Sequence, residues 1–481
     1  MTDTPCPLNI RRTPGKPRVV VVGCGFGGLS FAKRFKGDAD VVVLDRQNHH
    51  LFQPLLYQVA MAGLSGPDIA TPVRTIFRRR KNVETHLAEV RGVDLDRKVV
   101  EIEGGEVGYD YLVFAAGGKT NYFGNDHWRH QALGLKTLED AMAIRRRVLT
   151  SFERAESNPD PDETRRLMTI VVGGGGPTGV ELAGAMAELA RRVFREDFRH
   201  IDTGDAKVIL VEGGDRVLGM YPPERSEEAK RQLEQLGVEV RTGQLIREVH
   251  DDRVVLQGGG CIETRNVLWG AGVVASDITQ TFDDVPRDKT GRVEVNPDLS
   301  IPGYDDAFVI GDAAAVTQRD GSPVPGLAPA AMQMGRFVAD KLTARLKGTE
   351  QNSKRLDRFD YLDKGSMATI GRTKAVAQIR RFGFAGLPAW LLWVTIHLFF
   401  LVTFRNKLVV FIKWVVAYYQ YQRGARIVYE PRPRDDRDVL RDLPADDADC
   451  RDDDDRQPPP SGSTGSGPGE PAAAAPVAHP T

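Results

Sequence analysis

The sequence predicts an α/β fold with two Rossmann-like dinucleotide-binding domains, a C-terminal amphipathic helical region that anchors the chain to a membrane, and a disordered acidic tail. Three observations support this prediction. A glycine-rich loop follows an apolar strand at two places, with leading glycines at Gly23 and Gly174. Residues 364–429 are aromatic and basic and contain no Asp or Glu. Residues 430–481 are rich in Asp, Pro, Gly and Ala, a composition that cannot bury a core.

The first loop, residues 23–28, lies between a run of four valines and a predicted helix over residues 29–35. Its glycines permit a tight turn, a close approach of the backbone to a pyrophosphate and close packing of the helix, whose N-terminus faces the phosphates. Residues 39–45 form the next predicted strand. It ends in Asp45, 22 residues after Gly23, which is close to the usual spacing for a carboxylate that binds ribose hydroxyls.

The second loop, residues 173–179, also follows an apolar strand. The next predicted strand, residues 206–212, ends in Glu212, which lies 38 residues after Gly174 because the polar segment 191–205 lengthens the crossover. An ordinary strand, turn and helix without a ligand is the alternative for each loop. The strand and the acid that accompany both loops favour two dinucleotides on one chain.

Two further segments indicate which dinucleotide each loop binds. Residues 307–314 form a short strand that ends in Gly311 and Asp312 before a helix, and this arrangement resembles the second flavin motif of two-dinucleotide flavoproteins. Residues 111–118 resemble the hinge strand of the same flavin domain. The resemblance implies FAD at the first loop and a nicotinamide nucleotide at the second. Glu212 favours NADH over NADPH because a carboxylate repels a 2′-phosphate, although Arg216 nearby leaves NADPH open.

These assignments give the expected domain limits. The FAD-binding domain consists of two parts, residues 16–125 and 298–360, with the NADH-binding domain of residues 126–297 inserted between them. The membrane-associating region then covers residues 361–429, and the disordered tail covers residues 430–481.

The charge of the chain does not indicate a nucleic-acid partner. The 481 residues contain 65 Lys or Arg and 66 Asp or Glu, for a formal net charge of −1. Residues 431–481 hold six Arg and twelve acidic residues, so the rest of the chain carries a small positive net charge.

The four cysteines form no CxxC pair and no metal-ligand spacing; they are Cys6, Cys24, Cys261 and Cys450. We therefore expect a reducing compartment, no structural disulfide and no metal. Thiol chemistry at the flavin is disfavoured, because Cys24 lies inside a phosphate loop. The N-terminus lacks a charged and then apolar secretory pattern, so the globular part is expected to stay cytoplasmic.

The acid-free segment contains ten Lys or Arg and two apolar stretches, residues 387–404 and 408–421, split by Arg405, Asn406 and Lys407. Each stretch is short for a spanning helix, which needs about twenty apolar residues. Aromatic residues with flanking cations suit helices that lie on the anionic surface of a membrane, here the cytoplasmic face of the cell membrane. A spanning first stretch or a buried oligomer interface are the alternatives. His397 is expected to be a packed side chain rather than a ligand.

From about Arg18 to Val428, the chain resembles the type II NADH dehydrogenases, the single-subunit, non-proton-pumping NADH:quinone oxidoreductases of respiratory membranes. Three segments carry the resemblance: residues 49–60 match the segment beneath the flavin ring, residues 176–184 the NADH-domain motif, and residues 363–371 a later loop. One departure lies in residues 328–333, where the family often has Ala-Gln-x-Ala-x-Gln. Pro329 replaces the first glutamine, which leaves Gln333 as the polar contact for the quinone.

The resemblance implies that NADH passes a hydride to non-covalently bound FAD, which gives two electrons to a membrane quinone. The implied FAD-binding residues are Gly23, Gly25, Gly27, Gly28, Asp45, Arg46, Gln53, Val90, Ala116, Gly117, Gly311 and Asp312. Those implied for NADH are Gly174, Gly176, Pro177, Thr178, Gly179, Glu181, Glu212 and Gly272.

Three residues are the candidates for catalysis, each with a structural alternative. Glu181 positions the nicotinamide or supplies a proton, or it is only an acid favoured in the first turn of a helix. Lys364 neutralises the reduced flavin, or it is one more cation of the membrane-facing surface. Gln333, beside Pro329, binds the quinone carbonyl, or it is a plain residue of a helix over residues 332–342.

Two other functions remain open. The first is an NADH-dependent flavoprotein reductase that serves ferredoxin, oxygen or peroxide, which would not need a basic aromatic surface. The second is a non-catalytic, redox-sensing flavin-binding membrane protein, which would not need an intact nicotinamide loop. A homodimer is a further expectation from the family.

Overall fold

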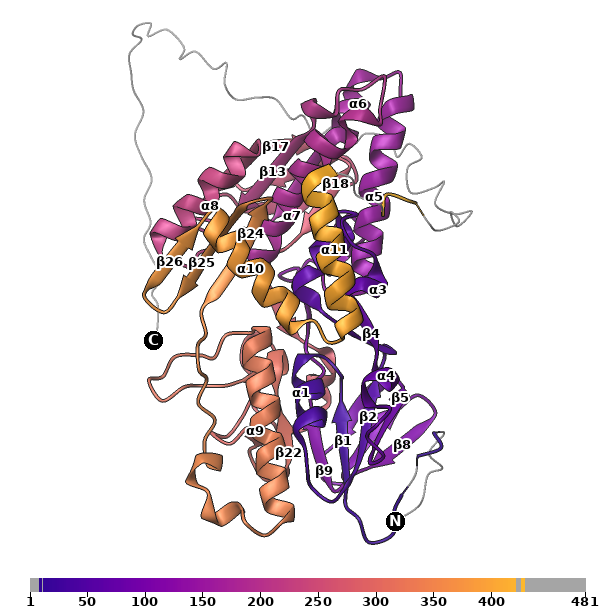
Figure 1. Ribbon diagram of the computed structural model, residues 1–481, viewed down its shortest axis with the longest axis vertical. Helices are drawn as coiled ribbons and strands as arrows, with labels where there is room; N and C mark the ends of the chain where they lie inside the picture. The colour runs from indigo at the N-terminus through magenta and orange to yellow at the C-terminus, as the bar shows by residue number, and fades with distance from the viewer. Residues whose placement is uncertain (1–7, 11, 421–424, 429–481) are drawn as a thin grey trace, which may run out of the picture. The chain divides into compact units, whose positions relative to one another are not determined.

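The structure is a computed structural model that describes residues 8–10, 12–420 and 425–428 (Figure 1). The disordered tail predicted for residues 430–481 lies outside the described residues, as do Cys6 and Cys450. The end of the second apolar stretch, at Tyr421, lies outside them as well.

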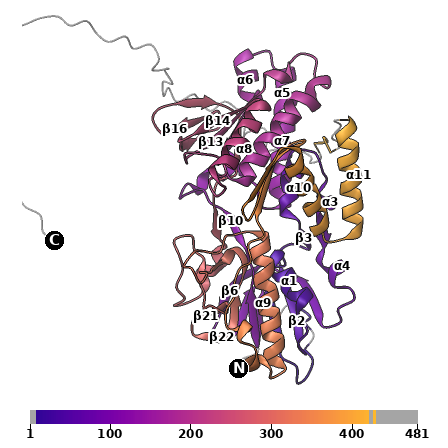
Figure 2. The same ribbon diagram turned by 60° about the vertical axis from the view of Figure 1, so that its left-hand side comes forward.

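The first sheet has six strands in the order β21-β22-β9-β1-β2-β5 and is parallel except at its edge strand β21. Its strands are β21 (Ser300–Ile301), β22 (Tyr304–Val309), β9 (Tyr111–Phe114), β1 (Arg18–Val22), β2 (Asp40–Asp45) and β5 (Val83–Leu87). Helix α1 (Phe26–Arg34) packs along α9 (Ala328–Leu346), as Figure 2 shows. This packing is close because a Cβ on Gly335 would lie 2.2 Å from the carbonyl oxygen of Gly27.

A small antiparallel sheet packs into the same hydrophobic core as the first sheet. Its three strands are β6 (Val90–Asp94), β7 (Val99–Ile102) and β8 (Gly105–Gly108). The connection from β2 to β5 contains β3 (His49–Leu51), α2 (Leu56–Ala60), α3 (Gly66–Ile69), β4 (Ala70–Pro72) and α4 (Val73–Phe77).

The second sheet has five parallel strands in the order β11-β18-β12-β13-β14. They are β11 (Ala132–Gly134), β18 (Asn266–Trp269), β12 (Thr169–Gly173), β13 (Lys207–Glu212) and β14 (Val238–Thr242). Alternate residues of β12 pack into different cores: Ile170 and Val172 share one with α5 (Leu138–Ser157) and α7 (Pro177–Glu188). Val171 packs with β15 (Ile246–Val249), β16 (Arg253–Leu256) and β17 (Cys261–Glu263). The two-residue period of a strand explains why both faces of this sheet are covered.

The chain returns from the second sheet to the first sheet after β19 (Val273–Ala275), earlier than the expected limit at Pro297. Strand β19 pairs with β10 (Gly118–Thr120), and these strands connect the two dinucleotide units. The chain after β19 packs with the first sheet, because Phe282, Val285 and Val293 belong to its core. The expected limit of the insertion at Pro297 therefore includes about twenty residues that the structure assigns to the first unit.

The C-terminal region ends with the two helices that we expected, and a sheet that the sequence did not indicate precedes them. Strands β24 (Ser366–Gly371), β25 (Lys374–Ile379) and β26 (Phe382–Ala385) form an antiparallel sheet that packs against α7, α8 (Pro223–Gln235) and α10 (Leu387–Phe400). Helix α11 (Phe404–Gln420) then follows α10. The break between the helices lies at residues 401–403, so the predicted break at Arg405, Asn406 and Lys407 is wrong. Those three residues belong to the first turn of α11.

Candidate functional site

The first glycine loop connects β1 with α1 at the carboxyl edge of the first sheet. Gly23 has a φ of +91°, and a Cβ on Gly28 would lie only 1.9 Å from the Gly23 carbonyl oxygen, so the turn requires glycine at both positions. A Cβ on Gly25 would meet nothing within 4 Å, so the outer side of the loop is open. The Asp45 carboxylate accepts a hydrogen bond from the Cys24 amide at 2.6 Å, which fixes the acid beside the loop.

The second loop repeats this geometry between β12 and α7. Gly174 has a φ of +98°, and a Cβ on Gly179 would lie 1.8 Å from the Gly174 carbonyl oxygen. Gly176 is open in the same way as Gly25. The Glu212 carboxylate accepts hydrogen bonds from the Gly175 amide and, at 2.6 Å, from the Gly214 amide. The longer crossover, with helical turns at Leu189–Val193, Phe194–Glu196 and Thr203–Asp205, thus leaves this acid beside its loop.

The Gly311 and Asp312 pair follows β22, as expected, but the expected helix does not begin there. A single 3-10 turn, Gly311–Ala313, is followed by the short strand β23 (Ala314–Ala315), and α9 begins only at Ala328. Helix α9 returns to the same edge, because a Cβ on Gly311 would lie 3.4 Å from the side chain of Ala331. Asp312 and the first loop are therefore brought to one edge of the sheet by tertiary packing.

Lys136 is a partly buried cation near Asp312 that the sequence did not indicate. Burial lowers the pKa of its ammonium group, and the charge of Asp312 partly opposes that change. The Lys136 backbone carbonyl accepts a hydrogen bond from the amide of the exposed Gln53 at 3.0 Å. Lys136 directly precedes the capping residue of α5 and belongs to no glycine motif, so no local pattern indicated it.

The other residues implied for the first loop lie around this edge. Arg46 is exposed and lowers the pKa of Asp45, although burial raises it by more. Val90 is buried at the start of β6. Ala116 and Gly117 follow β9, and a Cβ on Gly117 would meet nothing within 4 Å.

The remaining residues implied for the second loop lie at the carboxyl edge of its sheet. Pro177 and Thr178 form the first turn of α7, where a proline costs no hydrogen bond. Gly272 has a φ of +70° and lies on the segment that links β18 with β19. The adjacent residue Ala271 packs against Gly174, since a Cβ added to Gly174 would lie 2.7 Å from the Ala271 Cα.

A hydrogen bond joins His50 of β3 to Cys24 of the first loop. The His50 ring donates from Nδ1 to the Cys24 carbonyl oxygen at 2.9 Å, and burial lowers the pKa of His50 to about 4. Burial also raises the pKa of the Cys24 thiol. A buried thiol that stays protonated is a poor nucleophile, which agrees with the expectation that thiol chemistry is disfavoured here.

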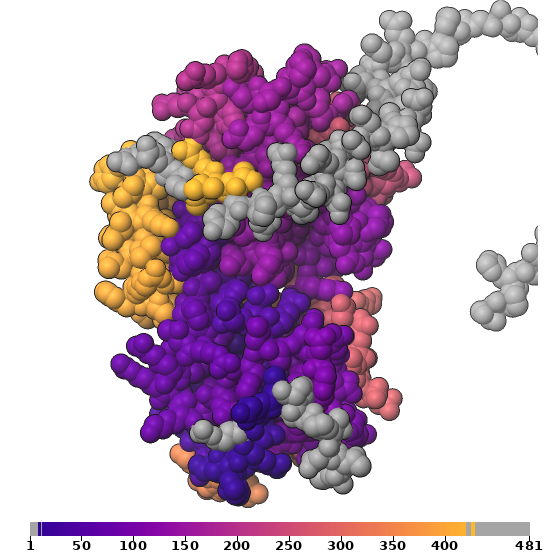
Figure 3. Space-filling view, turned by 90° about the vertical axis from the view of Figure 1, so that its right-hand side faces the viewer, coloured from indigo at the N-terminus to yellow at the C-terminus, as the bar shows by residue number. Residues whose placement is uncertain are grey.

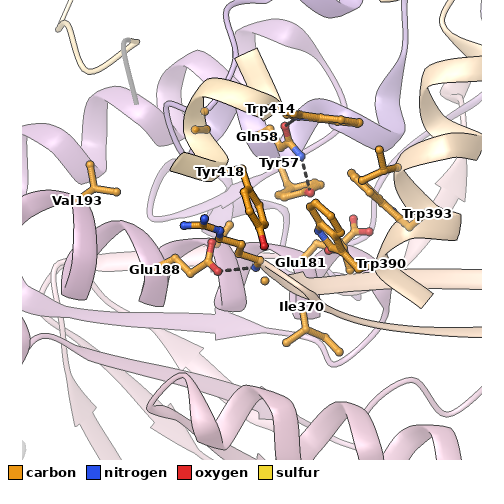
Figure 4. A pocket seen from close by; sticks show the side chains of 17 residues that line it. Tyr57, Gln58, Glu181, Glu188, Val193, Ile370, Trp390, Trp393, Trp414 and Tyr418 are labelled. Carbon is orange, nitrogen blue, oxygen red and sulfur yellow. Dashed lines mark hydrogen bonds between the residues drawn. The ribbon is translucent and has the colours of Figure 1, made fainter. Parts of the chain in front are cut away.

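Glu181, two residues after the second loop, lines a cavity of about 140 Å³ beside α7 (Figure 4). Burial raises the pKa of its carboxyl group to about 8, and a hydrogen bond from the Thr369 backbone opposes that rise. The group is therefore mostly protonated at neutral pH. The cavity is lined by residues of α2, α7, β24, α10 and α11, including Tyr57, Gln58, Trp390, Trp393, Trp414 and Tyr418.

The sequence analysis missed these cavity residues. The aromatic residues of α10 and α11 were expected to belong only to a membrane surface, and Tyr57 and Gln58 only to the segment 49–60 beneath the flavin ring. The only signal that could have linked them was the pairing of two apolar helices with the segment that contains Tyr57.

Pro329, Gln333 and Lys364 lie elsewhere and do not line this cavity. Gln333 is bound to the loop before β24: its Nε2 donates to the Leu362 carbonyl oxygen at 3.0 Å, and its Oε1 accepts from the Leu362 amide at 3.0 Å. Pro329 lies in the first turn of α9, and Lys364 is exposed on the loop that Gln333 holds. The structure thus brings these three residues into one neighbourhood, apart from Glu181.

The side of helix α11 that faces the protein carries both apolar and polar residues, with Val410 in the core, whereas its outer side is apolar. Asn406 is buried and donates weak hydrogen bonds to the α3 to β4 segment, and Lys413 forms an ion pair with the buried Asp68 at 2.6 Å. The opposite side carries large exposed apolar side chains: Phe404, Leu408, Phe411, Ile412, Val415 and Tyr419. Figure 3 shows this orange-yellow segment on the surface of the molecule.

Among the described residues, none of the helices combines the length and apolar character that crossing a membrane would require. His397 packs as expected: its Nδ1 donates to the Trp393 carbonyl oxygen at 2.7 Å, and its ring stacks on the Trp393 indole with centroids 4.2 Å apart.

Two protein families match this chain. Residues 17–335 match the pyridine nucleotide-disulphide oxidoreductases, and residues 364–419 match the NDH2 C-terminal domain. The chain is 41% identical over 423 residues to the type II NADH:quinone oxidoreductase Ndh of Mycobacterium tuberculosis, which covers 85% of this chain and 90% of that protein. It is 30% identical to the internal alternative NAD(P)H-ubiquinone oxidoreductase A1 of Arabidopsis thaliana, over 84% of each chain.

Solved structures share the fold. The NDH2 of Plasmodium falciparum in complex with NADH has a TM-score of 0.79 at 18% identity, and the match covers 86% of this chain and 100% of that one. The sulfide:quinone oxidoreductase of Aquifex aeolicus has a TM-score of 0.65 at 16% identity, over 84% of this chain and 95% of that one. These matches confirm the predicted α/β fold of the Rossmann type.

Proposed function

Because the chain belongs to the family of type II NADH:quinone oxidoreductases, we propose that it oxidises NADH through bound FAD and reduces a membrane quinone without pumping protons. The family membership confirms the resemblance found in the sequence. The observation that carries the proposal is the pair of equivalent loops, each with a glycine turn and an acid fixed beside it. One chain thus offers two dinucleotide sites, as a hydride donor and a flavin acceptor require.

The residues around the first loop fit non-covalent FAD. The open positions at Gly25 and Gly117 leave room for a ligand next to the backbone, while Gly23 and Gly28 are packed against the protein. The amides in the first turn of α1 have no acceptor within the helix and would bind the pyrophosphate. Asp45 and Asp312 would bind the ribose and the ribityl chain, and Gln53 and the partly buried Lys136 would contribute further polar contacts at this edge of the sheet.

The second loop would bind NADH in the same manner. The first turn of α7 would hold the pyrophosphate, and the fixed Glu212 carboxylate would accept from the ribose hydroxyls. The guanidinium of Arg216 donates to the Gly219 carbonyl oxygen at 3.0 Å, which directs it toward its own loop rather than toward a 2′-phosphate. We therefore propose a preference for NADH over NADPH.

The overall reaction converts NADH, one proton and a quinone into NAD⁺ and a quinol. FAD held at the first loop would supply the two-electron chemistry that links the two substrates. In the overall balance NADH provides one hydrogen and both electrons, so one proton must come from the protein or the solvent. We propose Glu181 as its source, because its carboxyl group is protonated at neutral pH and lies in a cavity next to the C-terminal helices. Lys364, on the exposed loop held by Gln333, remains a candidate for neutralising charge on the flavin.

The C-terminal helices support a peripheral attachment to the membrane. The outer side of α11 exposes large apolar side chains, whereas the ion pair and the buried asparagine lie on the side that faces the protein. An exposed apolar side of this kind suits contact with a lipid surface. Arg405 lies exposed in its first turn and would contact anionic headgroups. The cytoplasmic face and a homodimer stay predictions of the sequence.

The experiment that tests the function is an anaerobic reduction by NADH followed by reoxidation. We expect NADH to bleach the flavin absorbance and a quinone to restore it much faster than ferredoxin or oxygen does. Fast reoxidation by ferredoxin or oxygen alone would favour the other flavoprotein reductases. A flavin that NADH does not bleach would indicate a non-catalytic flavin-binding protein.

A further inference from the structure

Phe123 is an exposed aromatic residue whose backbone adopts a left-handed conformation. Its φ is +53°, and the residue is 62% exposed. It follows β10, which lies between the two dinucleotide units (Figure 2). The left-handed region is unfavourable for a residue with a Cβ, and bulky residues rarely adopt it. The surrounding structure must therefore hold this conformation.

Asparagine side chains on both sides of Phe123 hold this turn. The Phe123 amide donates to Asn121 Oδ1 at 2.8 Å. Asn125 Nδ2 donates to the carbonyl oxygens of Tyr122 at 3.2 Å and of Phe123 at 3.4 Å. The Asn121 carbonyl oxygen accepts from Trp269 Nε1 at 2.9 Å. Because Trp269 is the last residue of β18, the turn is attached to the end of a strand of the second sheet.

The Phe123 ring contacts the segment that links β18 with β19. A Cβ added to Gly272 would lie 2.9 Å from Phe123 Cζ. The residue before it, Ala271, packs against Gly174 of the second loop. The residue after it, Val273, is also apolar and 42% exposed. The ring therefore lies beside the second loop with most of its surface open to a ligand.

The order of the strands indicates which half of NADH reaches this ring. Strand β12, which leads into the second loop, has β13 on one side and β18 on the other. Glu212 at the end of β13 would bind the ribose of the adenosine half, and the N-terminus of α7 would bind the pyrophosphate. The nicotinamide half then extends past the end of β18, where Phe123 lies. The same direction leads to the flavin edge, because a Cβ added to Gly118 of β10 would lie 3.5 Å from the Asp312 Cβ.

We propose that the Phe123 ring packs against the nicotinamide half of bound NADH. The proposal rests on the proposed function and adds a contact for its donor substrate outside the glycine motifs. The dihydronicotinamide ring is flat and uncharged, so an aromatic side chain can cover it without leaving a charge unpaired. The contact removes the exposed ring of Phe123 from water. Asparagine or glycine would adopt the left-handed turn with less strain, so the proposed function lies in the ring itself.

The test compares Phe123→Asn, which suits the left-handed backbone and removes the ring, with Phe123→Tyr, which keeps a ring. We expect Phe123→Asn to raise the NADH concentration that half-saturates anaerobic flavin bleaching by about 3- to 10-fold, the effect of one partly buried apolar contact. The inhibition constant of ADP, which has no nicotinamide half, should stay as in the wild type. Phe123→Tyr should bind both NADH and ADP like the wild type.

Lys98→Asn is the matched control, because it places the same residue in the same backbone conformation at a distant turn. Lys98 is exposed and has a φ of +55°. It forms an ion pair with Asp306 of β22, and its carbonyl oxygen accepts from the Tyr109 amide just before β9. Lys98 therefore lies near the amino ends of these strands, opposite to the edge that carries the first loop. This variant should change neither the NADH nor the ADP constant.

Two results with the variants would overturn the proposal. An unchanged NADH constant in Phe123→Asn would leave Phe123 as a residue of the turn only. An equal loss of NADH and ADP binding would show that the ring does not act on the nicotinamide half.

Photolabelling provides a measurement that needs no variant. An NAD analogue with an azide on the nicotinamide ring, bound to the wild-type enzyme, should label a peptide that contains Phe123. Labelling of other peptides alone would overturn the proposal even if Phe123→Asn fails to fold. A wild-type flavin that NADH does not bleach would refute the proposed function instead.

Discussion

Replacing Glu181 by Gln should remove the alkaline limb from the pH profile of quinone reduction. Burial raises the pKa of this carboxyl group from 4.5 to about 8, so about nine in ten molecules carry the proton at pH 7, against well under one in a hundred for an ordinary glutamate. Wild-type turnover should therefore be flat below about pH 8 and fall above it. The Gln variant cannot supply a proton and should be slower by about 100-fold, with no inflection.

The same shift predicts an effect on stability, and its sign follows from proton binding. Between pH 4.5 and about 8 the folded protein keeps a proton that the unfolded chain has released, so the free energy of unfolding falls as pH rises through this window. At pH 7 the difference of 2.5 pH units from 4.5 corresponds to a cost of about 3 kcal/mol. Glu181→Gln removes this cost and should be more stable than the wild type at pH 7.

The assay measures steady-state quinone reduction at saturating NADH between about pH 6 and 9, together with urea unfolding at the two ends of that range. Glu188→Gln is the matched control, since Glu188 lines the same cavity and its carboxylate accepts from the Arg372 amide at 2.5 Å. That variant should keep the alkaline limb whatever its rate. An alkaline limb that persists in Glu181→Gln would refute the assignment of the proton to Glu181.

Three further outcomes test the loops and the C-terminal helices. Gly179→Ala should destabilise the second dinucleotide unit, because its Cβ would lie 1.8 Å from a backbone oxygen. Gly176→Ala should melt like the wild type and only weaken NADH binding. Melting curves with NADH titrations distinguish the two effects. Lys413→Met should lower the free energy of unfolding by about 1 kcal/mol and expose α11 to protease; an unchanged free energy of unfolding would contradict a stabilising role of its ion pair with Asp68. Leu408→Asp with Phe411→Asp should abolish sedimentation with anionic vesicles while NADH still bleaches the flavin; continued sedimentation would contradict membrane attachment through α11.

These point substitutions are preferable to removing the helices. Truncation near Leu387 would delete Trp393 and Trp414 and so open the cavity, because both side chains form its walls. A loss of activity would then not distinguish membrane attachment from a damaged site.

Local sequence signals predicted the elements that depend on local chemistry. The glycines and the acids at strand ends indicated both loops, because a turn with positive φ and a close helix approach exclude side chains. The apolar stretches 387–404 and 408–421 indicated α10 and α11, although the break between them was misplaced. A polar triplet is compatible with a helix end, but here Asn406 lies inside α11 and donates weak hydrogen bonds to the α3 to β4 segment.

Other predictions failed where distant parts of the chain meet. A helix was expected directly after Asp312, but α9 begins only at Ala328. The sequence of the strand and of the Gly-Asp pair does not indicate how far along the chain the helix begins. The limit at Pro297 was set by sequence spacing, whereas Phe282 and Val293 pack into the first core.

By itself, the sequence determined two dinucleotide units, the acid beside each loop and an apolar, basic C-terminal region, since each follows from a few adjacent residues. Only the tertiary structure decided that Tyr57, Glu181, Trp393 and Trp414 share one cavity, because they come from four helices that no periodicity relates. The same packing engaged Gln333 with Leu362 and left the Trp393 indole N–H without an acceptor among the described residues. Burial is a property of the assembled fold, and it alone raises the pKa of Glu181 into the range where a carboxyl group can deliver a proton at neutral pH.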